Sequence, residues 1–372
     1  MSTAPWNARA IDDTLASALT CVTRLEAVHP TLGVRALELV SAQLSYDEAR
    51  TPYVALSGAI AATPDALEVL DERAAVRLRV TLGYVYPGGE EDAHVVAELL
   101  LEDATVRRGG TPSIQVNAYS DEILMGDAPW TVPGPWTAAT TFGTAYRQLI
   151  AAIAGQPAAD AATVDPALEH ATFLPADETL TVHADDNLRQ LMRDLADRVS
   201  GRAYHDGLTG WRADLAAVDT GSVAAITTGR RGLIRSTEAT RDRGAWGNAV
   251  VIVYRWRDAT DTEHEIVGRA QRLTGPLGVE TVGRKTLPPI VRTTPTTQAA
   301  ADNAAAALLG RAITRRRVVA PEVARALWWI RAAQTVTVST PDDLPHSVIV
   351  SSVTFDLPAA TMQLRTRTPE EA

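Results

Sequence analysis

The sequence holds a single cysteine, Cys21, in 372 residues. One cysteine cannot form an intrachain disulfide or a cluster of thiolate metal ligands, so both kinds of framework are excluded. Its neighbours Leu19, Val22 and Leu25 predict a buried, small apolar residue, whereas a nucleophilic cysteine needs an exposed, electropositive setting. We therefore expect packing to supply the stability of the fold.

Lysine is almost absent, since Lys285 is the only one among 35 basic residues. Together with abundant alanine, this bias indicates a GC-rich coding sequence, such as an actinobacterial one, and no particular chemistry. The formal charge of -10 argues against a general nucleic-acid binder, because affinity for phosphate backbones needs a concentrated basic surface. An acidic wall still allows DNA to pass without sticking.

Long apolar runs are missing as well. None approaches the roughly 18 residues that span a bilayer, and the N-terminal MSTAPWNARAIDDTLAS lacks the basic start and continuous apolar core of a signal peptide. We expect no membrane-spanning segment and synthesis in a cytoplasm. With 46% hydrophobic and 22% charged residues, the chain has a globular composition and the length for two or three domains.

Catalytic motifs are also lacking. The sequence has no glycine-rich phosphate loop ending in Lys-Ser/Thr, and Lys285 lacks the upstream glycine at the required spacing. The sequence has no G-x-S-x-G motif, which carries the nucleophilic serine of many hydrolases, so nothing in it indicates a serine hydrolase. We predict no enzymatic activity, no catalytic residues, no cofactor and no metal.

Two groups of polar residues could carry chemistry. His183, Asp185 and Asp186 are competent metal ligands, but Asp185 or Asp186 is also well placed to cap a following helix, and we favour the cap. His205 and Asp206 could form an acid–base pair, but a turn before Trp211 explains the same residues better.

Three further features have a structural and a functional interpretation. Glu263, His264 and Glu265 could bind a cation or sense pH, although alternating charges on the wet face of a hairpin are more common. The arginines at 315–317 could contact phosphate, although a helix C-terminus favours cations anyway. The tryptophans could anchor protein interfaces or pack in a core, with equal weight; they include Trp246, Trp256, Trp328 and Trp329.

Period-two alternation dominates the first third of the chain and predicts antiparallel strands over one core. The alternating segments lie at residues 34–44, 53–61, 77–82, 94–106 and 113–119. Turns at 87–89 and 107–110 join them, and Pro64 opens at most a short helical turn. A β-barrel or sandwich is the economical prediction.

Helical periodicity begins at Phe142 and ends at Gly155. Residues 156–177 are rich in alanine, proline and aspartate and predict a linker arm. A second helix is expected from near Asp185 to Gly201, followed by two short strands around a turn.

The last third returns to β structure. AVVIVYRW at 249–256 predicts a central strand buried on both faces, and an alanine-rich helix follows at 297–313. Further strands are expected at residues 328–330, 334–339, 347–357 and 362–367.

The predicted fold class is α+β, mainly β, with two β-barrel-like domains and an inserted α+β region. The predicted domains are a barrel at 1–130, a helix and linker arm at 131–177, an inserted α+β domain at 178–246, and a second barrel with the alanine-rich helix at 247–372. Two β domains around a helical insertion are consistent with a diverged duplication.

Several segments, in this order, resemble the tail-hub proteins of long-tailed bacteriophages of actinobacteria, which are related to baseplate hubs and to the N-terminal part of tail-associated proteins. The segments are 44–47, 51–58, 70–71, 77–80, 83–84, 120–122, 188–191, 204–206 with Trp211, 246–250, and 350–357 with Thr361, Met362, Thr366 and Arg367. They span most of residues 30–368.

The resemblance implies a structural, non-enzymatic tail-tip protein of the virion. It implies a homotrimer in which two barrels per chain form a pseudo-sixfold ring around the DNA channel used in genome ejection. Expected partners are further copies of the chain, the distal tail protein, the tail tube, the tape measure protein and tip fibre or receptor-binding proteins, with transient, unspecific DNA passage. Because the sequence stops at Ala372, we expect host binding or wall cleavage in other subunits.

Two alternatives stay open. One is a tail-borne cell-wall hydrolase that uses His183, Asp185, His205 or Asp206. The other is the hub of a phage-derived contractile injection device.

Overall fold

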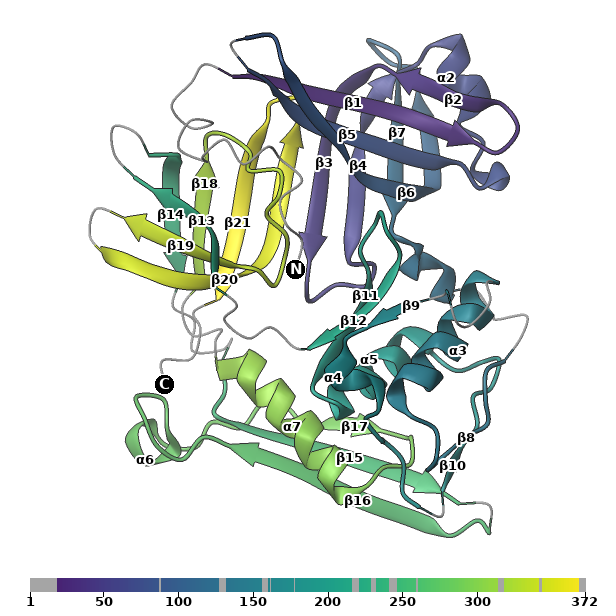
Figure 1. Cartoon of the computed structure of the whole chain (residues 1–372), viewed down its shortest axis with the longest axis vertical. Coiled ribbons are helices and arrows are strands. Elements are labelled where there is room, and N and C mark those ends of the chain that lie inside the picture. The colour runs from purple at the N-terminus through teal and green to yellow at the C-terminus, as the bar shows by residue number, and fades with distance from the viewer. Residues whose placement is uncertain are drawn as a thin grey trace.

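The structure is a computed structural model. It describes residues 19–86, 88–126, 132–155, 160, 162–176, 178–215, 221–228, 232–240, 246–258, 260–313, 318–340 and 343–367. Two curled β-sheets lie side by side, and two smaller α/β units lie beneath them (Figure 1). The chain is mainly β, as the sequence predicts.

The first curled sheet, barrel 1, is built from the alternating segments near the N-terminus. Its strands are β1 (Thr20–His29), β2 (Gly33–Leu37), β3 (Leu39–Asp47), β4 (Val54–Ala61), β5 (Arg77–Val85), β6 (Glu91–Arg107) and β7 (Ser113–Tyr119). They pair in the order β3-β4-β7-β6-β5-β1-β2. The two end strands, β3 and β2, follow each other in the chain. The segment predicted as one strand at 34–44 therefore forms two strands, which are separated at Glu38.

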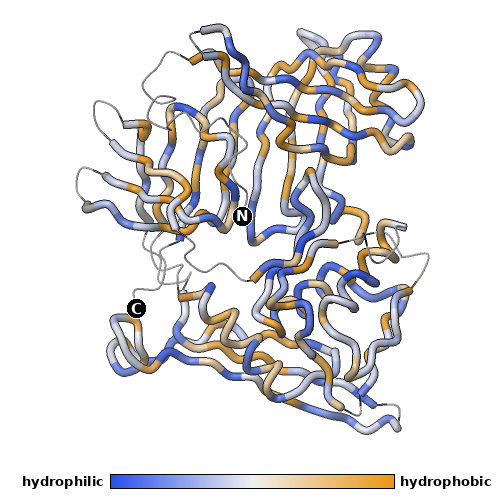
Figure 2. The backbone as a smooth tube through the Cα atoms, viewed as in Figure 1, coloured by the Kyte–Doolittle hydropathy of each residue, from blue (hydrophilic) through white to orange (hydrophobic). Residues whose placement is uncertain are grey.

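The same alternation gives barrel 1 an apolar inside. Leu78, Val80 and Leu82 on β5 are buried, while Arg79 and Thr81 between them are half-exposed, since successive side chains point to opposite faces of a strand. Apolar and polar residues alternate along the barrel strands in Figure 2. The short helix α2 (Pro64–Val69) and the 3-10 turn η1 (Glu72–Ala74) join β4 to β5.

The second curled sheet, barrel 2, combines strands from two distant parts of the chain. They are β13 (Ser222–Thr227), β14 (Ile234–Thr240), β18 (Val318–Val323), β19 (Thr335–Thr340), β20 (Asp343–Leu357) and β21 (Thr361–Arg367). Their order is β14-β18-β21-β20-β19-β13. Strand pairing therefore groups residues 222–240 with the C-terminal strands, across the predicted boundary between 178–246 and 247–372.

The two barrels are fused by main-chain pairing. Residues Ser352 to Leu357 of β20 pair antiparallel with Asp47 to Ala42 of β3, so one sheet runs through both barrels. The apolar interiors also form one continuous cluster. Trp328 is fully buried between the barrels, where its indole N–H donates to the Gly83 carbonyl at 3.3 Å and its ring lies 5.3 Å from Phe355.

Barrel 2 repeats the topology of barrel 1. In chain order, β2 to β7 correspond to β13, β14, β18, β19, β20 and β21, and every antiparallel pair among β3 to β7 has its counterpart. Strand β1 is extra. It lies between β5 and β2, which are therefore parallel to each other, and the equivalent β19 and β13 pair directly and in parallel.

The β-bulges repeat as well. The register of β3 against β4 shifts between Leu39 and Ser41, and that of β14 against β18 shifts between Ile234 and Ser236. The register of β6 against β7 shifts between Leu101 and Asp103, and that of β20 against β21 between Val350 and Ser352. Because bulges are specific local features of a strand pair, their coincidence supports the duplication that the sequence suggested.

The middle unit lies between the barrels and the far end of the molecule. Its elements are η2 (Asp121–Gly126), β8 (Trp136–Thr137), α3 (Phe142–Ala154), β9 (Ala162–Val164), α4 (Pro166–Glu169), β10 (Thr179–Leu180), α5 (Leu188–Arg198), β11 (Gly201–His205) and β12 (Trp211–Leu215). Helix α3 ends as predicted, with Gly155 in the left-handed conformation. The predicted linker arm is only partly irregular, because β9 pairs with β12 and α4 packs beside α3.

The far unit is inserted between β14 and β18. It contains β15 (Ala249–Arg257), β16 (Glu263–Gln271), α6 (Val279–Val282), β17 (Ile290–Arg292) and α7 (Gln298–Ile313). Strand β15 is central in this sheet, as predicted, but it is not buried on both faces. Helix α7 covers one face, while Arg255 and Arg257 on the other are exposed.

A strand predicted at 328–330 does not form. Residues 324–334 instead make the turns between β18 and β19 that carry Trp328 into the contact between the barrels. The three consecutive large apolar residues that suggested a strand are buried because both barrels surround them.

Candidate functional site

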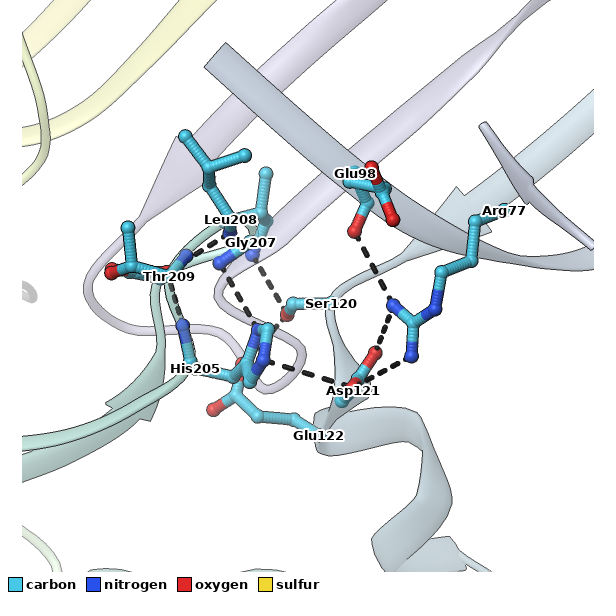
Figure 3. A network of polar contacts seen from close by, with 12 residues as sticks. Arg77, Glu98, Ser120, Asp121, Glu122, His205, Gly207, Leu208 and Thr209 are labelled. Carbon is cyan, nitrogen blue, oxygen red and sulfur yellow. Dashed lines mark hydrogen bonds and ion pairs between the residues drawn. The ribbon is translucent and has the colours of Figure 1, made fainter. Parts of the chain in front are cut away.

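A buried polar cluster lies where barrel 1 meets the middle unit (Figure 3). We call it the polar joint and define it as Arg77, Ser120, Asp121, Glu122 and His205. Strand β7 ends at Tyr119, and residues 120–122 lead from it into the first turn of η2. The β11–β12 hairpin brings His205 to the same corner. Two segments of the phage resemblance, 120–122 and 204–206, thus meet here.

Asp121 links the two units. Both oxygens of its carboxylate accept hydrogen bonds from the Arg77 guanidinium, at 2.8 and 2.9 Å, and one of them lies 3.7 Å from Nε2 of His205. The other ring nitrogen of His205 accepts from the Gly207 N–H at 3.1 Å. Burial lowers the pKa of His205, although Asp121 and Asp206 oppose the shift, so the ring is neutral at pH 7.

Glu122 is the most buried carboxylate of the joint, with 1% of its surface exposed. It accepts hydrogen bonds from the Tyr53 N–H and from the Ser120 hydroxyl, the latter at 2.9 Å. Burial raises the pKa of Glu122 to about 7, against the opposing effect of these hydrogen bonds.

His205 and Asp206 do not form an acid–base pair. One oxygen of Asp206 accepts from the N–H groups of Leu208 and Thr209 at 2.9 and 2.7 Å, and the other accepts from the Arg212 guanidinium at 2.8 Å. Burial raises the pKa of Asp206, but the hydrogen bonds outweigh it and leave the pKa below its usual range. The structural interpretation, a turn before Trp211, is confirmed.

The predicted metal ligands form part of a helix start. Asp186 accepts from the His183 N–H at 2.8 Å, and the N-cap of α5 is Asn187, which accepts from Gln190 at 3.0 Å. The predicted cap at Asp185 or Asp186 is therefore wrong, because Asn187 is the residue that directly precedes the first helical turn. Within the described ranges, no group of three or more His, Cys, Asp or Glu residues could hold a metal ion.

Glu263 and Glu265 of β16 lie on the wet face of a hairpin, as expected, whereas His264 lies on the other face, opposite Trp256. Glu265 pairs with Arg255 across the strands at 2.7 Å. His264 stacks on Trp256 with 5.2 Å between ring centroids and lies 2.9 Å from the Asp258 carboxylate. The arginines at 315–317, interpreted as a phosphate contact or as the cationic end of a helix, lie outside the described residues.

Most of the singled-out apolar residues belong to cores. Trp256, Trp328 and Trp329 are buried, and Trp246 is partly exposed under the Lys285 ammonium, 4.9 Å from the ring centroid. Cys21 is half-buried against the barrel core, and burial raises its pKa. The thiol is thus less buried than expected and is held in its neutral form.

A second buried polar cluster, on helix α5, was not predicted from the sequence. Arg198, with none of its side chain exposed, donates to Asp194 at 2.8 Å and to the Pro295 carbonyl at 2.6 Å. Asp194 also accepts from the Tyr254 hydroxyl at 3.0 Å, which ties α5 to β15. The available signal was the spacing of Asp194 and Arg198, four residues apart on the helix.

A small pocket borders this cluster between the start of α5 and β17, with Asp194 and Arg292 in its wall. Its volume of ≈ 130 Å³ is below the roughly 300–1,000 Å³ of ligand sites.

In the part of the chain that is described, no helix is both long and apolar enough to cross a membrane.

No protein-family model and no curated protein matches the sequence. Solved structures do match the fold. A tail protein from Neisseria meningitidis MC58 has a TM-score of 0.62 at 12% identity, and the match covers 94% of this chain and 97% of that one. The 43 kDa tail protein of prophage MuSo2 from Shewanella oneidensis has a TM-score of 0.62 at 12% identity, with 93% and 98% covered.

The prophage tail protein gp18 from Listeria monocytogenes EGD-e also matches, with a TM-score of 0.53 at 11% identity and 94% and 95% covered. The chain therefore has the fold of phage tail proteins over nearly its whole length. These three organisms lend no support to an actinobacterial host, which stays a prediction.

Proposed function

We propose that this chain is a structural hub protein of a phage tail tip. In the proposed virion, three copies form a ring in which six barrels surround the DNA channel and join the tail tube to the host-facing end. The observation that carries the proposal is the duplicated pair of barrels fused through β3 and β20, in a fold that matches phage tail proteins from end to end.

The fused barrels suit this role because their geometry is fixed inside each chain. Main-chain pairing, a shared apolar core and the buried Trp328 set the angle between the two barrels. A threefold assembly of such pairs presents six similar units to a sixfold tube, which is the symmetry match implied by the resemblance. Proposed partners are the distal tail protein, the tail tube, the tape measure protein and tip fibre or receptor-binding proteins.

We also propose that the protein is not an enzyme. The rival is a cell-wall hydrolase that uses His183, Asp185, His205 or Asp206. Its support is weak, because His205 is buried in the joint and Asp206 holds a turn. Zymography on host peptidoglycan tests it, and clearing that is lost in His205→Ala would favour the hydrolase.

Mass photometry and negative-stain imaging of the purified protein test the hub. We expect particles of three times the protomer mass with a central hole, and the same protein in purified tails. A stable monomer that is absent from tails would contradict the proposal. Neighbouring genes separate a flexible tail from a contractile device, since a sheath gene accompanies contraction.

A further inference from the structure

Among the described residues, the strands β2 and β13 each pair on one side only, and two further strand edges, one on each barrel, also lack a main-chain partner. Strand β6 pairs with β5 only up to Leu100, and from Asp103 to Arg107 it pairs, among the described residues, with β7 alone. Strand β14 pairs, in the same described part, with β18 alone. Figure 1 shows β14 at the left-hand edge of the molecule and β6 in the right-hand barrel.

Both free edges have counterparts that are paired inside the chain. The bulges align Asp103 on β6 with Ser352 on β20, so residues 103–107 correspond to 352–356. They also align Ser236 on β14 with Ser41 on β3. Strands β20 and β3 pair with each other between the barrels. The free edge of β6 is therefore equivalent to the paired edge of β20, and the free edge of β14 is equivalent to the paired edge of β3.

We propose that residues 238–240 of β14 in one copy pair antiparallel with residues 105–107 of β6 in the next copy, and so repeat part of the β3·β20 junction between chains. The occupant of each edge is thus a second copy of this chain. This inference rests on the proposed ring and specifies its interface. Because the contact joins two different surfaces, it is head-to-tail and generates a ring when the rotation closes.

The register follows from the internal junction. There, Gln43 lies opposite Asp356, and the Gln43 amide donates to the Asp356 carboxylate at 3.0 Å. Gln43 corresponds to Glu238 and Asp356 to Arg107. The contact between copies therefore places Glu238 opposite Arg107, and both side chains are exposed in the single chain. An opposite-charge pair stabilises two paired strands, whereas like charges directly opposite destabilise them.

An exposed apolar residue supports the same contact. Val106 is 38% exposed, although it occupies the position of Phe355, which is fully buried in the internal junction. Exposed apolar edge strands invite pairing with another chain, and proteins that remain monomeric block them. Pairing with β14 would cover Val106 as the internal junction covers Phe355.

A charge swap tests the register. Arg107→Glu and Glu238→Arg, each alone, put like charges opposite each other at every copy-to-copy contact and should weaken association about tenfold or more. The double variant restores the opposite-charge pair and should recover the ring. Arg257→Glu, an exposed change in the far unit, is the matched control and should leave the ring intact. Mass photometry over a concentration series measures each.

Cross-linking provides a second, independent readout. In a Cys21→Ser background, Arg107→Cys combined with Glu238→Cys should form disulfide-linked dimers and trimers on non-reducing gels, because directly opposed strand residues lie within disulfide reach. Each single cysteine variant should stay uncrosslinked. A ring that tolerates both single charge reversals and gives no cross-link overturns this interface and leaves the proposed hub standing. A wild-type chain that is monomeric at all concentrations and absent from tails overturns both.

Discussion

At the scale of single residues, the side chains that could have carried catalysis or bound a metal have structural roles instead. Asp206 and Asn187 hold a turn and a helix start, and His205 is buried against Asp121 and Trp211. Residue types and spacing predicted the turn. They could not predict the polar joint, because Asp121 and His205 are far apart in the sequence and meet only after barrel 1 and the hairpin have folded.

Glu122→Gln should remove a pH dependence of stability. Burial raises the pKa of Glu122 to about 7 from its ordinary value of 4.5. The protonated carboxyl therefore contributes stability fully below pH about 4.5, and this contribution is lost as pH rises through about 7. The difference is on the order of 3 kcal/mol. An uncharged amide should flatten this slope in urea unfolding between pH 4.5 and 8.

Glu265→Gln is the control for this measurement, because Glu265 is an exposed member of a surface ion pair. Its unfolding profile should keep the wild-type pH slope. If Glu122→Gln also kept that slope, Glu122 would not be the titrating group.

Arg198→Met should strongly destabilise the middle unit. The substitution leaves the Asp194 carboxylate buried without its cationic partner on α5, and breaking a buried pair in this way costs about 3–5 kcal/mol. Denaturant unfolding measures the loss. Arg50→Met, at an arginine whose side chain is 74% exposed beside Asp47, should change stability by no more than about 0.5 kcal/mol. Equal effects of the two changes would refute a structural role for the buried cluster.

At the scale of elements, alternation and helical periodicity were reliable guides. Strands β5 and β7 and helices α3 and α7 form where their patterns indicate. The errors arose where tertiary contacts override a local pattern. Trp328 and its neighbours form turns because two barrels enclose them, and β15 is covered on one face because a single helix packs on its sheet.

Helix α7 can lie close to its sheet because β16 has a glycine there. A Cβ at Gly268 would lie 2.2 Å from the Ala301 carbonyl oxygen, a backbone atom that cannot move alone. Gly268→Ala should therefore push α7 away and cost about 1–3 kcal/mol. Gly310→Ala, on the same helix with nothing within 4 Å, should instead stabilise by about 0.5–1 kcal/mol. Thermal unfolding of the two variants should shift in opposite directions, and equal shifts would contradict the close packing.

The contact between the barrels depends on Trp328. Its replacement by alanine removes a fully buried ring packed near Tyr84 and Phe355, and truncating a buried tryptophan costs about 3–5 kcal/mol. Trp246→Ala, at a partly exposed ring, should cost clearly less. Denaturant unfolding measures both, and hydrogen exchange should show lost protection in both barrels for Trp328→Ala. Loss confined to barrel 2 would contradict a shared core.

At the scale of the whole molecule, the order of elements carried more information than any single motif. The sequence suggested two β domains and a duplication, and strand pairing and matching bulges support it. Local patterns could not reveal that β13 and β14 belong with the C-terminal strands. That grouping depends on pairing between strands that the whole far unit separates in the sequence, and a periodic pattern within one segment carries no information about such pairing.

We propose that pairs of fused barrels assemble into a closed ring by repeating their internal junction. A reconstruction of the purified oligomer or of the tail tip by electron cryomicroscopy tests it most directly. We expect six barrels around a channel, with β3·β20 pairing inside each chain alternating with β14·β6 pairing between chains. A particle whose chains meet through other surfaces, or a lone protomer, would contradict it.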